Sequence, residues 1–124
     1  MNKLPEHINI EEREELLDTM ANKNDTLRIV YRINTGKRNL PEEVLDYICN
    51  LLIENEDDAN VDYKAITFFF WKDGMAVGEE PALASLTYAP GGLWERSMEQ
   101  VSENMPEMKL AVDFNNYGPE HIND

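Results

Sequence analysis

The sequence predicts an α+β fold, a two-layer sandwich with a β-α-β-β core, in which a mixed sheet of three to five strands carries a helix on one face. Three successive segments predict this core. Apolar and polar residues alternate over 27–33, with the period of a half-buried strand. Residues 41–55 begin with Pro41 and repeat apolar side chains at three- and four-residue intervals, which is typical of a helix with one buried face. Residues 63–72 are aromatic and β-branched, as in a strand.

The order of these segments and the residues before them predict two further features. A strand, a helix and a strand in succession predict that the two strands are parallel neighbours in the sheet. Asn9 is a candidate helix N-cap, and Glu12 stands three residues later as its capping partner. We therefore expect an additional N-terminal helix from Ile10 to Asn22.

The chain after the second strand is predicted to add strands to the same sheet. Small, alternating residues over 82–89 predict a strand that runs antiparallel to 63–72, and shorter strands are expected at 93–98 and 109–114. A chain of 124 residues fits one domain. We expect a single domain, 1–124, with these parts: an N-terminal helical segment at 1–24, the α+β core at 25–114 and a flexible tail at 115–124.

The charge of the chain is strongly negative and unevenly distributed. Its 25 Asp and Glu residues against 11 Lys and Arg give a formal net charge of −14. Residues 41–62 contain eight acids and no base, whereas residues 25–40 contain four bases and one acid. Because binding to phosphates requires Lys and Arg, we expect no direct binding to nucleic acid. The simplest interpretation of the acidity is that it keeps the domain soluble.

We expect no membrane span, because no segment is apolar over the roughly 20 residues that a spanning helix needs. The N-terminus has no apolar region of the kind found in signal peptides, so a cytoplasmic location is expected, or export if a leader was removed. The one cysteine, Cys49, cannot form an internal disulfide. It lies among apolar helix residues without a neighbouring His, and we expect it to be buried and unreactive.

The sequence predicts no catalytic residue, no cofactor site and no metal site. Asp58, Asn60 and Asp62 have the spacing of the first three calcium ligands in an EF-hand loop. Tyr63 and Phe69, however, stand where that loop needs Gly and Glu. A solvated acidic loop is therefore the favoured interpretation of this stretch.

Aromatic residues supply the candidate interaction surface. The strand predicted at 63–72 is apolar on both faces, and one helix can cover only one of them. Trp, Tyr, Met and Phe are enriched at protein interfaces, although they also build ordinary cores, and a second small core closed by the chain termini is the alternative. The residues of this candidate surface are Phe69, Trp71, Met75, Tyr88 and Trp94.

The stretch FFFWKDGMAVGEEPALASLTYAPGGLWE, from Phe68 to Glu95, resembles a family of small bacterial domains that are often found in exported proteins or lipoproteins. In that family an aromatic strand leads into a Gly-Met turn and then into a small-residue strand that ends near Pro-x-Gly. The resemblance covers about residues 25–95, and this chain has Asp73 where proline is expected. It implies the same order of elements and implies export, and it assigns no functional residue.

These observations favour a non-enzymatic protein-binding domain that engages another protein, or a second copy of the chain, through the aromatic face of the strand at 63–72 or through an acidic helix. Two alternatives stay open. The first is an acidic inhibitor that imitates nucleic acid and blocks a nucleic-acid-binding protein. The second is a small hydrolase with carboxylate chemistry, which would need a pocket that holds a carboxylate of raised pKa.

Overall fold

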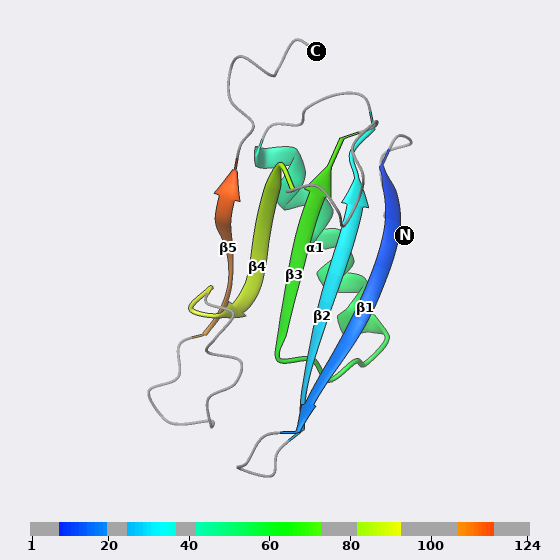
Figure 1. Cartoon of the computed structure of the whole chain (residues 1–124). Helices are drawn as coiled ribbons and strands as arrows, with labels where there is room; N and C mark the ends of the chain where they lie inside the picture. Colours follow the sequence, from blue (N-terminus) through cyan, green and yellow to red (C-terminus); the bar gives the residue numbers. More distant parts are fainter. Residues whose placement is uncertain (1–7, 20–24, 37–41, 73–81, 93–106, 116–124) are drawn as a thin grey trace.

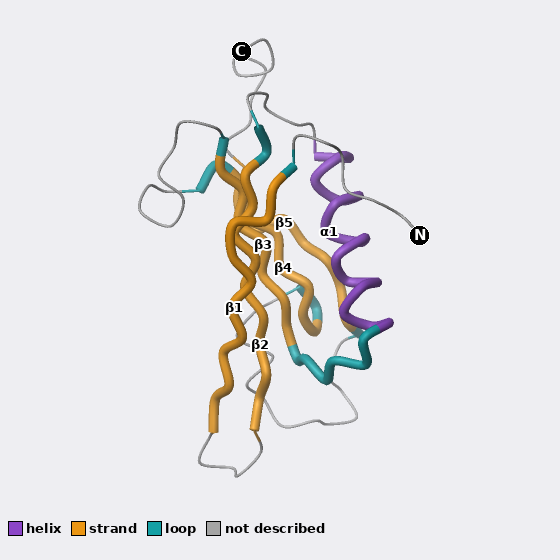
Figure 2. Tube along the Cα trace, turned by 90° about the vertical axis from the view of Figure 1, so that its right-hand side faces the viewer, coloured by secondary structure: helices purple, strands orange, loops and turns teal. Residues whose placement is uncertain are grey.

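A computed structural model describes residues 8–19, 25–36, 42–72, 82–92 and 107–115. These residues form a five-stranded mixed sheet in the order β1-β2-β3-β4-β5 and one helix, which lies along one face of the sheet (Figures 1 and 2). The elements in chain order are β1 (Asn9–Thr19), β2 (Asp25–Asn34), α1 (Glu42–Asp58), β3 (Ala65–Trp71), β4 (Ala84–Pro90) and β5 (Met108–Asn115).

The predicted core is confirmed in its elements and in its strand directions. β2 and β3 are parallel neighbours, and α1 is the connection between them. β3 and β4 are antiparallel, as expected, and β5 adds a further antiparallel strand beside β4. The helix continues to Asp58, beyond the predicted end at Asn55. The strand expected at 93–98 and the tail after Asn115 lie outside the described residues.

The predicted N-terminal helix is wrong, because the segment Asn9–Thr19 forms the edge strand β1. Its Glu and Leu residues favour a helix locally, but this weak preference yields to antiparallel pairing with β2 along the whole strand. The side chains alternate as a strand requires. Glu12 and Glu14 both contact Arg32 of β2, whereas the intervening Arg13 contacts the helix. The pairing also contains an irregularity between Ile10 and Glu12.

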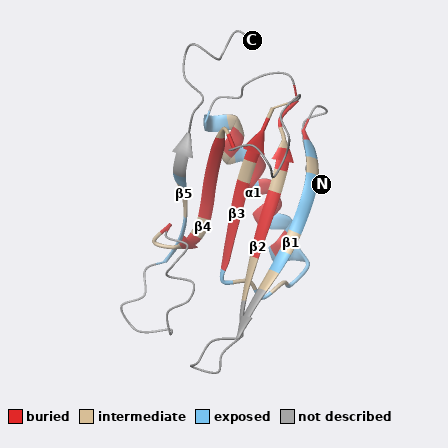
Figure 3. Cartoon of the chain, in the orientation of Figure 1, coloured by how far each residue is buried: buried red, intermediate tan, exposed pale blue. Residues whose placement is uncertain are grey.

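The core lies between α1 and the sheet face that it covers. β3 and β4 are mostly buried, whereas much of the edge strand β1 is exposed (Figure 3). Among the described residues, the largest side chains that are fully buried are Phe68 and Phe70, alternate residues of β3. Tyr31 of β2 stacks on Phe68 with ring centroids 5.4 Å apart and an interplanar angle of 7°. The helix residues that meet this layer are Leu45, Ile48, Cys49, Leu52 and Ile53.

Within the part of the chain that the structure describes, no helix has both the length and the apolar character needed to cross a membrane.

Candidate functional site

The predicted aromatic surface is divided between the two faces of the sheet. Tyr88 stands opposite Ile66 in the antiparallel pairing of β3 and β4, on the face that α1 covers. Phe69 stands opposite Ser85, on the other face, because successive residues of a strand point to opposite sides. Trp71 shares the face of Phe69. Met75 and Trp94 lie outside the described residues.

Phe69 and Trp71 differ in exposure although their rings are neighbours, with centroids 6.0 Å apart. Trp71 is 4% exposed, whereas Phe69 is half-buried. The backbone carbonyl of Trp71 accepts hydrogen bonds from the Thr35 amide at 2.7 Å and from the Thr35 hydroxyl at 3.1 Å. Trp71 is thus an interior residue, and Phe69 is the more accessible of the two.

Tyr88 belongs to a half-buried aromatic contact beside the C-terminal end of α1. Its ring lies 6.2 Å from that of Tyr63, and the two planes are tilted by 53°. The Tyr63 hydroxyl donates a hydrogen bond of 2.7 Å to Oδ1 of Asp57. Burial and this hydrogen bond to a carboxylate raise the pKa of Tyr63, so its hydroxyl keeps its proton at neutral pH.

The residues that follow α1 form a turn that ends the helix. The Val61 amide donates to the Glu56 carbonyl at 3.1 Å, and the Asn60 amide donates to the Asp57 carbonyl at 3.0 Å. Asn60 has a positive φ of 59°, which is the left-handed conformation that ends many helices. Asp58, Asn60 and Asp62 are therefore parts of a helix-terminating turn. No group of three or more His, Cys, Asp or Glu residues that could hold a metal ion occurs among the residues described.

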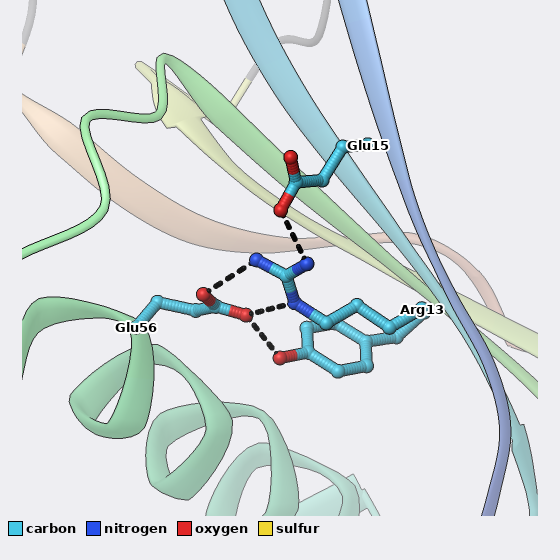
Figure 4. Close-up of polar contacts among 4 residues, drawn as sticks. Arg13, Glu15 and Glu56 are labelled. Carbon is cyan, nitrogen blue, oxygen red and sulfur yellow. Dashed lines mark hydrogen bonds and ion pairs between the residues drawn. The ribbon is translucent and has the colours of Figure 1, made fainter. Parts of the chain in front are cut away.

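A polar cluster among the described residues joins β1, β2 and α1, and the sequence did not predict it (Figure 4). Arg13 binds Glu56 in a two-pronged arrangement, with Nε 2.7 Å from Oε2 and Nη2 2.8 Å from Oε1. The Tyr31 hydroxyl also donates to Oε2 of Glu56. A third nitrogen of Arg13, Nη1, lies 2.6 Å from the exposed carboxylate of Glu15.

The electrostatics of this cluster favour its charged form. Burial by itself would raise the pKa of the Glu56 carboxyl, but the hydrogen bonds from Arg13 and Tyr31 and the charge of Arg13 outweigh burial and lower it. Burial, followed by the hydrogen bond to Glu56, raises the pKa of Tyr31. The Arg13 pKa is raised by its hydrogen bond to Glu56. At neutral pH Glu56 and Arg13 thus stay charged, and the Tyr31 hydroxyl keeps its proton.

The chemistry open to Glu56 is limited by these three donors. A carboxylate that acts as a general acid near neutral pH needs a raised pKa, whereas the pKa of Glu56 is lowered. Both of its oxygens already accept hydrogen bonds from within the chain. The cluster therefore fastens the edge strand β1 to the C-terminal part of α1.

Cys49 is fully buried in the core, as the sequence predicted. Burial and the nearby charge of Asp46 raise the pKa of its thiol. A thiol with a raised pKa stays protonated at neutral pH and is a weak nucleophile.

The outer face of α1 carries an exposed tyrosine between carboxylates. Tyr47 is 49% exposed, and Glu43, Asn50 and Glu54 are exposed on the same side of the helix. Their spacing of four, three and four residues places all four in one stripe along α1. The helix contains seven acids and no Lys or Arg. We call Glu43, Tyr47, Asn50 and Glu54 the α1 stripe. The acids between the apolar repeats of the sequence signalled an exposed helix face, but Tyr47 stands at the margin of the apolar repeat and its exposure comes from the packing of α1.

Comparison of the chain with models of protein families, with curated proteins and with solved structures found no match. The resemblance of Phe68–Glu95 to small bacterial domains stays a prediction.

Proposed function

We propose that this chain is a non-enzymatic protein-binding domain that uses the α1 stripe to bind a partner with a basic surface. The observation that carries the proposal is the exposure of Tyr47 in the middle of an acidic helix face. Tyrosine is enriched among the residues that contribute most to binding, because its side chain buries a large area and loses little conformational entropy.

The charges around Tyr47 specify the kind of partner. The helix has seven acids and no base, and Glu56 is the one that Arg13 neutralises. The chain as a whole carries −14. Such a field accelerates association with basic surfaces and repels acidic ones. Binding through this face should therefore weaken as salt concentration rises.

The experiment begins with capture of the partner by the full chain from cells of the organism that makes it. The captured protein is identified, purified and titrated calorimetrically against the wild type and against Tyr47→Ala. We expect Tyr47→Ala to raise the Kd by at least about tenfold, the effect of losing an interface anchor. An unchanged Kd would remove the α1 stripe from the interface.

A matched pair of charge variants separates the stripe from net charge. Glu43→Gln with Glu54→Gln removes two charges from α1, and Glu11→Gln with Glu12→Gln removes two from β1. We expect the first pair to weaken binding more than the second. Equal weakening would mean that only the overall charge matters. If the purified partner is a nucleic-acid-binding protein, competition with its nucleic acid distinguishes an acidic inhibitor from a simple binding domain.

A further inference from the structure

The outer edge of β5 is chemically unlike the other edge of the sheet. β5 and β1 lie at opposite ends of the strand order, and among the described strands each pairs with one neighbour (Figure 1). An edge strand has backbone amide and carbonyl groups on its free side that can pair with another strand. β1 contains five acids and one base and so carries a net charge of −4. β5 contains Lys109 and Asp113, so its net charge is zero.

Exposed apolar side chains mark β5 as well. Of the large hydrophobic residues that are exposed in the described part of the chain, Met108 and Val112 lie on β5, with 36% and 38% of their surfaces accessible. Met108, Leu110 and Val112 stand opposite Pro90, Tyr88 and Leu86 of β4, so these three share the face on which α1 lies. α1 passes behind the middle of the sheet, whereas β5 lies at its end (Figure 1).

The central sequence of β5 is complementary to itself in the antiparallel direction. Residues 109–113 read Lys, Leu, Ala, Val, Asp, so that opposite charges flank two apolar residues and a small central one. If two copies pair antiparallel about Ala111, Lys109 of each copy stands opposite Asp113 of the other, and Leu110 stands opposite Val112. Opposite charges and apolar side chains in directly facing positions stabilise strand pairs. Parallel pairing in register would instead set Lys109 against Lys109.

We propose that β5 pairs antiparallel with β5 of a second copy of this chain about Ala111, which joins the two sheets edge to edge. The paired segment is Lys109–Asp113. It ends where the β4–β5 register shifts, because Ser85 stands opposite Phe114 and Leu86 opposite Val112, which leaves Asp113 as an extra residue.

Salt distinguishes this self-association from the proposed binding of a basic partner. Each copy carries −14, so the two copies repel each other through their overall charge. Added salt screens this repulsion, while backbone pairing and apolar contact between the edges persist. Dimerisation through β5 should thus strengthen with salt, whereas binding to a basic partner should weaken. Failure of either proposal leaves the other testable.

The test is sedimentation of the full chain over a range of concentrations, at low and at high salt. We expect a monomer–dimer equilibrium that shifts toward the dimer as salt rises. Lys109→Asp should weaken the dimer at least about tenfold, because it sets two carboxylates opposite each other. Adding Asp113→Lys to Lys109→Asp should restore the dimer, because the exchanged charges again face opposite charges.

The control is Lys64→Asp, which makes the same change of net charge at an exposed residue before β3. It should leave the dimer in place at high salt, and circular dichroism should show that all variants are folded. A chain that stays monomeric at every concentration and salt overturns the proposal. So does a Lys109→Asp variant that dimerises as well as Lys64→Asp. Failure of the charge exchange to restore the dimer overturns the antiparallel register.

Discussion

The two edge strands are attached to the sheet and presented to solvent in opposite ways. β1 carries a net charge of −4 from five acids and one base, and Arg13 fastens it to Glu56 of α1. β5 carries no net charge and pairs antiparallel with β4, while Leu110 packs against the core and Ala111 lies close to Gly92 in the turn after β4. One edge strand is thus strongly charged and fastened to the helix, whereas the other has no net charge and is the strand that we propose to pair with a second copy.

The side of β1 that faces α1 combines apolar and charged contacts. Ile8, which directly precedes β1, belongs to the core, and Ile10 of β1 packs against it. The part-buried ion pair between Arg13 and Glu56 adds a polar contact between β1 and α1. A bidentate arginine suits this task because it satisfies both carboxylate oxygens at once.

The largest effect is expected where β5 approaches the turn after β4. Gly92 has a φ of +78°, and a Cβ built there would lie 2.6 Å from Cβ of Ala111. Gly92→Ala should therefore destabilise the fold by about 3 kcal/mol, from the left-handed backbone and the clash together. Urea unfolding measures the loss. Adding Ala111→Gly should remove the clash and restore part of the lost stability, while the cost of the left-handed backbone remains. A double variant as unstable as Gly92→Ala would contradict this packing of Gly92 against Ala111.

The contact that fastens β1 to α1 is tested at Glu56. Glu56→Ala should destabilise the fold by about 2 kcal/mol, because it leaves the Tyr31 hydroxyl and the Arg13 guanidinium without their acceptor. The Arg13 side chain is 31% exposed and can regain water, which limits the loss. Urea unfolding at neutral pH measures it. Arg13→Met combined with Glu56→Leu should cost less than Glu56→Ala alone, because no buried charge is left unpaired. A larger cost for the double variant would show that the cluster acts as more than a fastening.

The smallest effect is expected from pH, since protonation weakens the same cluster without removing it. The pKa of Glu56 in the folded chain lies below its ordinary value of 4.5, so the unfolded chain takes up the proton first as pH falls. The contribution of the ion pair is complete above the ordinary value and is lost as pH falls through the lowered pKa. Urea midpoints from pH 7 to pH 3 should therefore fall less steeply for Glu56→Gln than for the wild type. Glu54→Gln, an exposed change on the same helix, should follow the wild type, and parallel slopes for Glu56→Gln would contradict the expectation.

The sequence predicted those elements whose pattern is local and regular. The apolar repeat of residues 41–55 identified α1, and the alternation in 27–33 identified β2, because each period is set by the element itself. β1 was missed because its Glu and Leu residues are good helix formers in isolation. Its strand character comes from pairing with β2, including the contact of Arg32 with Glu12 and Glu14.

The candidate sites were less accessible to sequence reasoning for the same physical reason. Arg13 and Glu56 are 43 residues apart in the chain, so their contact depends on the register of β1 and on the placement of α1. Phe69 and Tyr88 were grouped by residue type, but the pairing of β3 with β4 puts them on opposite faces. Tyr47 lies at the margin of the apolar face in the helix repeat, and only the packing of α1 decides that it is exposed.

The parallel pairing of β2 with β3 also bears on how the chain folds. The other ladders of the sheet, β1–β2, β3–β4 and β4–β5, join strands that follow each other in the chain, whereas β2 and β3 have the whole of α1 between them. Closing that longer loop costs more chain entropy before any contact repays it. The central ladder is therefore expected to form late, when the docking of α1 brings two preformed antiparallel units together. Amide hydrogen exchange during refolding would show the amides that bond across the β2–β3 ladder protected after those of the β1–β2 and β3–β4 ladders.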